Sequence, residues 1–201
     1  MQTLLAILVL LIAFVLHAAQ ASTNLLAIYL LDRPAAQPWP NLDAAHLKDL
    51  KPVSPPALAD SDFVAFNLTN HTFVVTGAAA KRLSLQIWSL AKKDAPGWGG
   101  QVPIVYRTGD FALIPVPAPF VLEACGERIY AGAFYTGFSS SGFSGPVIMG
   151  EREFIKMKQP KGATFSFSIG LGYPGALPGT PDPRGDRRIA SAVQRLVANR
   201  H

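Results

Sequence analysis

The amino-acid sequence predicts an α+β fold, with a mainly antiparallel sheet and two packed helices. Short β-prone segments bounded by turn residues recur along the chain, and two longer segments repeat apolar residues with the period of an amphipathic helix. The 201 residues include 17 glycines and 17 prolines, which indicates many turns and argues against a helical bundle. Because short turns join strands that run in opposite directions, most strand pairs are expected to be antiparallel.

The first elements are a strand and a helical turn. Leu25 to Leu31 is a short apolar run that ends before Asp32 and Pro34, a pattern typical of a buried strand. A helical turn is expected between Leu42 and Leu50. It ends there because Pro52 and the prolines after it cannot continue a helix.

A hairpin and the first helix follow. The strands are expected at Asp62 to Phe66 and Thr72 to Thr76, since the asparagines between them favour a turn. The helix is expected from Ala78 to about Lys92, with the hydroxyl of Thr76 as its N-cap. Its apolar stripe consists of Leu83, Ile87, Leu90 and Ala91.

The second half of the chain is mostly β-prone. Strands are expected at Pro103–Arg107, Phe120–Ala124, Arg128–Tyr135, Pro146–Met149 and Thr164–Leu171. Cys125-Gly126-Glu127 predicts a tight turn between the second and third of these. The last strand alternates apolar and polar residues, which predicts one buried face. A loop rich in proline and glycine is expected after it, from Gly172 to Gly185.

The second helix is expected from Asp186, its N-cap, to about Asn199. Its basic side carries Arg187, Arg188 and Arg195. The formal net charge is +5, and the whole excess lies from Glu151 onward. The expected partner is a protein or ligand of the cell envelope, and the basic excess adds an anionic surface as an alternative. Nucleic acid is not expected, because aromatic residues do not interleave with the basic ones.

The N-terminal segment has the pattern of a secretory signal. Leu4 to Leu16 is entirely apolar but shorter than the roughly 20 residues that a membrane span needs. Ala19-Gln20-Ala21 then offers a small-x-small cleavage site. We expect a signal peptide at 1–21 and one α+β domain at 22–201, secreted or periplasmic. Because no Lys or Arg precedes the apolar run, an uncleaved membrane anchor is the alternative.

The cysteine, histidine and glycine residues of the sequence favour a binding protein over an enzyme. A single cysteine excludes an internal disulfide, and the histidines lack metal-ligand spacing, so neither a metal nor a cofactor is expected. The glycines from Gly170 to Gly175 match a dinucleotide-binding motif, but the prolines that follow prevent the helix which that site requires.

Aromatic residues beside a Ser/Gly loop mark the expected ligand-binding face. The candidate residues are Tyr135, Phe138, Ser139, Ser140, Ser141 and Phe143. The sequence thus predicts a non-enzymatic binding domain. The alternative is a secreted hydrolase that uses His71, one of these serines and an acid such as Asp62.

Two stretches carry a resemblance to known proteins. They run from Ala59 to Leu83 and from Glu123 to Phe134, the second followed by Phe143-Ser144-Gly145-Pro146-Val147-Ile148. Together they resemble a group of uncharacterised exported bacterial proteins and, more distantly, the head of the periplasmic domain of SecD. The resemblance implies a small α+β module of the cell envelope that acts by contact, and it brings no catalytic residues.

Overall fold

A computed structural model of the protein describes residues 24–32, 46–93, 106–108, 111–113, 118–135, 142–149 and 162–200. The expected signal peptide at 1–21 lies outside these ranges. So do four of the candidate ligand-binding residues, namely Phe138, Ser139, Ser140 and Ser141.

The described strands form one large sheet and one small one. The large sheet contains β1 (Leu26–Leu30), β2 (Phe63–Asn67), β3 (Thr72–Thr76), β6 (Ala118–Ala124), β7 (Glu127–Tyr135), β8 (Phe143–Met149) and β9 (Thr164–Tyr173). Its order is β1-β6-β7-β8-β9-β3-β2, and every neighbouring pair is antiparallel except the parallel pair β7 and β8. The small sheet pairs β4 (Tyr106–Thr108) with β5 (Phe111–Leu113). The predicted α+β class is confirmed.

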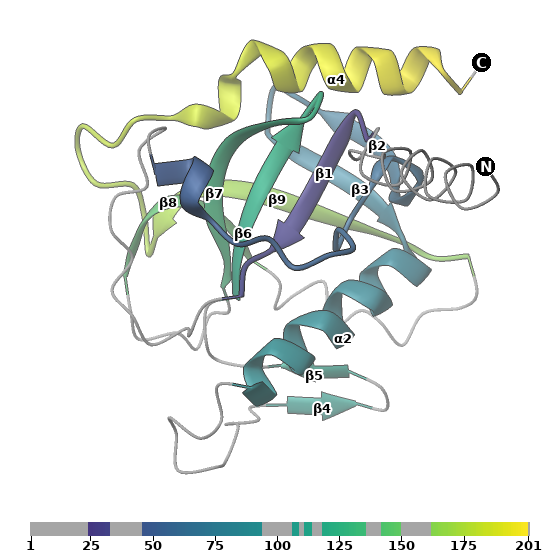
Figure 1. Ribbon diagram of the computed structural model, residues 1–201, viewed down its shortest axis with the longest axis vertical. Helices are drawn as coiled ribbons and strands as arrows, with labels where there is room; N and C mark the ends of the chain where they lie inside the picture. The colour runs from purple at the N-terminus through teal and green to yellow at the C-terminus, as the bar shows by residue number, and fades with distance from the viewer. Residues whose placement is uncertain are drawn as a thin grey trace, which may run out of the picture.

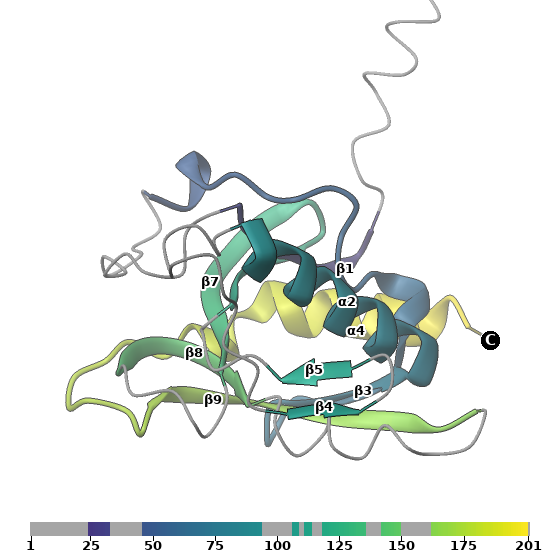
Figure 2. The same ribbon diagram turned by 90° about the horizontal axis from the view of Figure 1, so that it is seen from below.

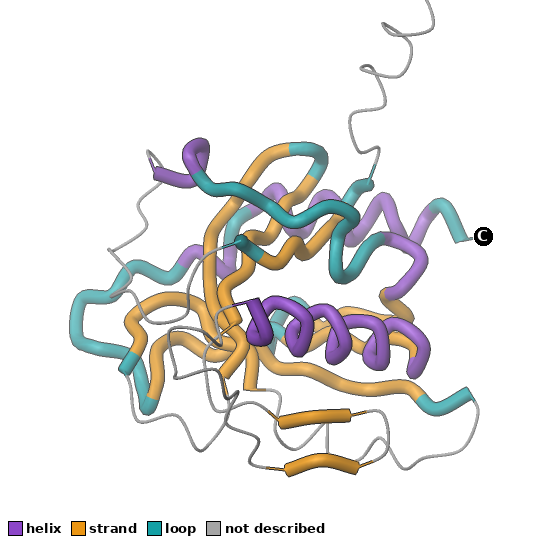
Figure 3. The backbone as a smooth tube through the Cα atoms, turned by 60° about the horizontal axis from the view of Figure 1, so that its bottom comes forward, coloured by secondary structure: helices purple, strands orange, loops and turns teal. Residues whose placement is uncertain are grey.

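Within the described ranges, two α-helices and three short 3₁₀ helices accompany the sheets. They are α2 (Gly77–Lys93), α4 (Arg187–Ala198), η1 (His46–Asp49), η2 (Asp60–Asp62) and η5 (Pro183–Gly185). Figure 1 shows α4 across one end of the strands and α2 near the other. In Figures 2 and 3 the large sheet bends back on itself, and Figure 2 shows β1 and β3 on opposite sides of the core that both strands line.

Backbone N–H groups along the edge of β1 donate hydrogen bonds to a side chain and to a backbone carbonyl of the segment before β2. The carboxylate of Asp60 accepts hydrogen bonds from the N–H groups of Leu25 and Leu26, each at 2.8 Å. Farther along the strand, the N–H of Ile28 donates to the carbonyl of Leu58 at 2.9 Å. These bonds cover an edge that is otherwise open to pairing with another chain, and they tie the segment before β2 to β1.

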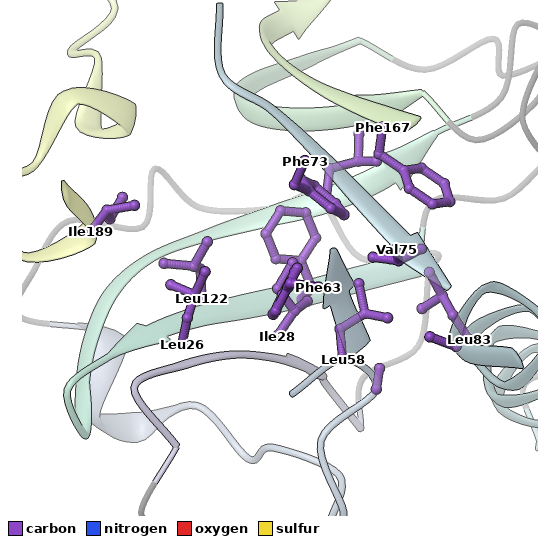
Figure 4. Packing of buried hydrophobic residues seen from close by; sticks show 14 of the residues in the cluster. Leu26, Ile28, Leu58, Phe63, Phe73, Val75, Leu83, Leu122, Phe167 and Ile189 are labelled. Atoms are coloured by element: carbon purple, nitrogen blue, oxygen red, sulfur yellow. The ribbon is translucent and has the colours of Figure 1, made fainter. Parts of the chain in front are cut away.

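The largest apolar cluster fills the interior of the bent sheet. Its members include Val75, Leu83, Phe120 and Phe167, each with no exposed surface. Figure 4 shows how side chains from several strands and both helices gather there. Since each fully buried side chain of this size contributes about 1.5–3 kcal/mol, this cluster is the main source of stability.

The local predictions hold at most elements. The hairpin strands lie where expected, and the Thr76 hydroxyl accepts from the N–H of Ala79 at 3.2 Å to cap α2. Asp186 caps α4 by accepting from the N–H of Arg188 at 2.8 Å. The strand β9 continues to Tyr173, past its expected end at Leu171, because Tyr173 pairs with Phe143 of β8.

Candidate functional site

Of the predicted aromatic face, the structure describes Tyr135 and Phe143. Tyr135 is only 2% exposed, and its ring lies 5.8 Å from that of Phe143 and 5.0 Å from that of Tyr173. The three rings pack with Ala133 and Val147 in a small cluster separate from the main core. Tyr135 therefore packs within the fold and does not present its ring to a partner, while Phe143 is half-buried.

The predicted basic surface is partly engaged in contacts within the domain. The guanidinium of Arg188 donates two hydrogen bonds to the carboxylate of Asp186 and one, at 2.7 Å, to the carboxylate of Glu127. Arg195 is exposed, with its Nη1 atom 3.6 Å from the sulfur of Cys125. Arg187 is exposed on the first turn of α4. Two of the three predicted arginines thus face solvent, and the third anchors α4 to the turn between β6 and β7.

The residues proposed for a hydrolase are not assembled where the structure describes them. Asp62 is buried beside α2, where it accepts a hydrogen bond from the guanidinium of Arg82. His71 lies at the opposite end of the β2–β3 hairpin, about 15 Å away at the rise of an extended strand. Asp62 is therefore not the acid partner of His71.

A pocket in the interior of the bent sheet is the strongest candidate site. It has a volume of about 30 Å³ and is partly open to solvent. Its apolar wall includes Leu26, Ile28, Phe63, Phe73, Leu122 and Ile189. Figure 4 shows these six side chains converging from β1, β2, β3, β6 and α4. Phe66 and the exposed Leu68 form part of the wall nearest the β2–β3 turn.

A tyrosine supplies the most unusual polar group of this pocket. Tyr130 on β7 is 4% exposed, and its hydroxyl has no hydrogen-bond partner among the described residues. Burial raises the pKa of this hydroxyl, so it stays protonated and can donate a hydrogen bond. An unsatisfied hydroxyl costs about 1–3 kcal/mol, and sites that retain such a cost are often functional.

Arg184 forms the charged part of the pocket. Its guanidinium donates from Nε and Nη2 to the two carboxylate oxygens of Asp182, at 2.8 and 2.7 Å. Its Nη1 donates to the carbonyl of Ile169 on β9 at 2.7 Å. The hydrogen bonds that Asp182 accepts from the Arg184 side chain lower the pKa of this carboxyl group to about 2. The side chain is therefore held in one orientation against the sheet.

The β2–β3 turn completes the polar lining. The side chain of Asn67 is committed to the turn, since it accepts hydrogen bonds from the N–H groups of Thr69 and Asn70. His71 adopts a left-handed backbone conformation with φ of 52°, and its carbonyl accepts from the N–H of Ile169. His71 thus lines the pocket from a turn that is fixed on both sides.

This arrangement favours binding a small molecule. Ligand sites are typically apolar clefts with a few convergent polar groups. The described residues contain no group of three or more His, Cys, Asp or Glu placed to hold a metal ion. Sequence reasoning missed Tyr130 and Arg184, because the first reads as a core residue and the second lies in a proline-rich loop.

The comparisons with known proteins add no relative. No protein-family model, no curated protein and no solved structure matches this chain. Within the described ranges, every helix is too short or too polar to cross a membrane.

Proposed function

We propose that this protein is an exported binding domain whose pocket takes a small molecule with an apolar body and one polar end. The observation that carries the proposal is the buried Tyr130 hydroxyl, which has no hydrogen-bond partner among the described residues and lies in a mainly apolar pocket. A ligand that accepts a hydrogen bond from this hydroxyl would remove its desolvation cost. Binding energy would come from apolar contacts with the rings of Phe63 and Phe73.

The fold supports such a site by holding its walls in place. Phe63 packs edge-on against Phe73 with ring centroids 5.7 Å apart, and Phe73 stacks on Phe167 at 5.4 Å. The two edges of the sheet are joined near the pocket through Asp60. Walls that are rigid before binding lose little conformational freedom on binding, which favours affinity for a small ligand.

Calorimetric titration with pentanol tests the proposal. We expect saturable one-to-one binding to the domain, and weaker binding to the Tyr130→Phe variant, which lacks only the hydroxyl. The Leu68→Trp variant places a large ring at the mouth of the pocket, on a side chain that is 39% exposed. It should weaken binding without disturbing the core.

The matched control is Leu85→Trp on α2, since Leu85 is 44% exposed and does not line the pocket. Its affinity for pentanol should equal that of the natural domain. Equal affinity in all three variants would place binding outside the pocket and contradict the proposal. So would the absence of any saturable binding.

Export is the second part of the proposal, and the N-terminal sequence supports it. The apolar run to Leu16 and the small residues Ala19 and Ala21 fit a cleaved signal. Mass spectrometry of the full chain expressed in a secreting bacterium tests this. We expect a mature protein that starts at Ser22, whereas an intact N-terminus would contradict cleavage.

A further inference from the structure

The guanidinium of Arg184 has donors to spare. An arginine side chain carries five N–H groups. Three of them are used, two on Asp182 and one on the carbonyl of Ile169. The remaining two lie on the terminal nitrogens Nη1 and Nη2. Because the first three bonds fix the plane of the group, the remaining donors are held in place before a ligand arrives.

The charges around the pocket are arranged asymmetrically. Among the described residues, those that line it include Arg184 and His71 but no aspartate or glutamate. Asp182, the acid paired with Arg184, is not a lining residue, and its side chain is 42% exposed to solvent. Solvent screens that carboxylate, so the polar end of the pocket presents net positive character to a ligand.

We propose that the polar end of the ligand is a carboxylate, an inference that rests on the function proposed above. The carboxylate accepts hydrogen bonds from the Tyr130 hydroxyl and from Arg184, while the apolar body lies against Phe63 and Phe73. Guanidinium and carboxylate groups match in shape, and hydrogen bonds between charged groups are about twice as strong as neutral ones. The ligand class is therefore short aliphatic or aromatic carboxylic acids.

The size of the pocket limits the length of such an acid. A cavity of about 10–15 Å³ holds one buried water, so the pocket's volume of about 30 Å³ accommodates the carboxylate of the ligand and little more. The apolar body must therefore extend from Phe63 and Phe73 to the open side, beside Phe66 and the exposed Leu68. Valerate, with its short flexible tail, is a suitable probe, and pentanol is its neutral counterpart with the same number of carbons.

Calorimetric titration of the domain with valerate and with pentanol at pH 7 tests the inference. We expect valerate to bind about tenfold more tightly, as a charge-assisted hydrogen bond implies. The Arg184→Gln variant should lose about tenfold more affinity for valerate than for pentanol. The matched control Arg187→Gln, at an exposed arginine outside the pocket, should change neither affinity.

The outcomes separate this inference from the proposed function. Equal binding of valerate and pentanol to the natural domain would overturn the carboxylate preference and leave the binding pocket standing. The same conclusion follows if Arg184→Gln weakens both probes equally. If neither probe binds, the proposed function itself fails. Because the first comparison uses only the natural domain, the test does not depend on the folding of a variant.

Discussion

Removing the hydroxyl of Tyr130 should make the ligand-free domain more stable. The Tyr130→Phe change keeps the ring, which packs edge-on against Phe120 with centroids 6.3 Å apart. It removes only an oxygen that is buried without a partner among the described residues. A buried unsatisfied hydroxyl costs about 1–3 kcal/mol, so we expect the free energy of unfolding to rise by about that amount.

Urea denaturation followed by circular dichroism measures this change. For a domain of this size each kcal/mol corresponds to about 2–4 °C in Tm, so thermal melting gives a second readout. The control is Tyr29→Phe on β1, because Tyr29 is also buried but packs in a different cluster, outside the pocket.

The reasoning distinguishes two outcomes. A rise in stability for Tyr130→Phe together with a loss of ligand affinity is the signature of a group retained for function at a cost in stability. A fall of about 1 kcal/mol or more in the free energy of unfolding would refute the account, because it is what the loss of a satisfied buried hydroxyl produces.

Three further perturbations test the fold and the pocket. Leu83→Ala on α2 should lower the free energy of unfolding by about 2–5 kcal/mol, as measured by urea denaturation. Leu85→Ala, at a half-exposed site on the same helix, should lower it by less than about 1 kcal/mol. Similar losses in the two variants would contradict the packing. Gly132→Ala should destabilise by about 3 kcal/mol or prevent folding, because its Cβ would lie 2.4 Å from a backbone oxygen of β8; an unchanged Tm would contradict this close approach. Asp182 is stabilising above its unfolded pKa of 3.8, and its contribution is lost as pH falls toward about 2, since Arg184 lowers the folded pKa. Asp182→Asn should therefore reduce the fall in Tm between pH 4 and about 2. Because the side chain is exposed, the effect on the free energy of unfolding should be less than about 1 kcal/mol. A Tm that depends on pH as in the natural domain would contradict the pairing.

Local chemistry explains why much of the fold was predictable. Capping residues define the starts of both helices, and Thr76 and Asp186 make the expected hydrogen bonds. The turn at Cys125 and Gly126 has positive φ at both residues, as a two-residue hairpin requires. These signals act within a few residues, so they can be read without knowing the rest of the structure.

The parallel pairing of β7 with β8 was not predictable in the same way. Turn residues predict antiparallel neighbours, but they do not reveal which strands become neighbours across a sheet. Gly132 on β7 shows the physical requirement, because only a residue without a Cβ fits against the carbonyl of Pro146 and the ring of Phe120. This close approach involves residues of β6, β7 and β8, so it cannot be recognised from the sequence of any one strand.

The burial of Tyr135 was not predictable from the sequence, because β7 is buried on both faces. Successive side chains of a strand point to opposite faces, so Tyr130 and Tyr135 lie on different sides of the sheet. A strand with one exposed face shows its orientation through alternation, as β9 does, but β7 is apolar throughout its second half. The sequence therefore did not show which tyrosine lines the interior, nor that Arg184 joins it there.

The most direct test of the binding pocket is an NMR titration of the domain with tyrosine labelled at ¹³Cζ. The Cζ resonance reports hydrogen bonding by each hydroxyl separately. We predict that saturating valerate shifts the Tyr130 resonance and leaves that of Tyr29 unchanged. An unshifted Tyr130 resonance at concentrations that saturate the protein would place the ligand elsewhere and contradict the account.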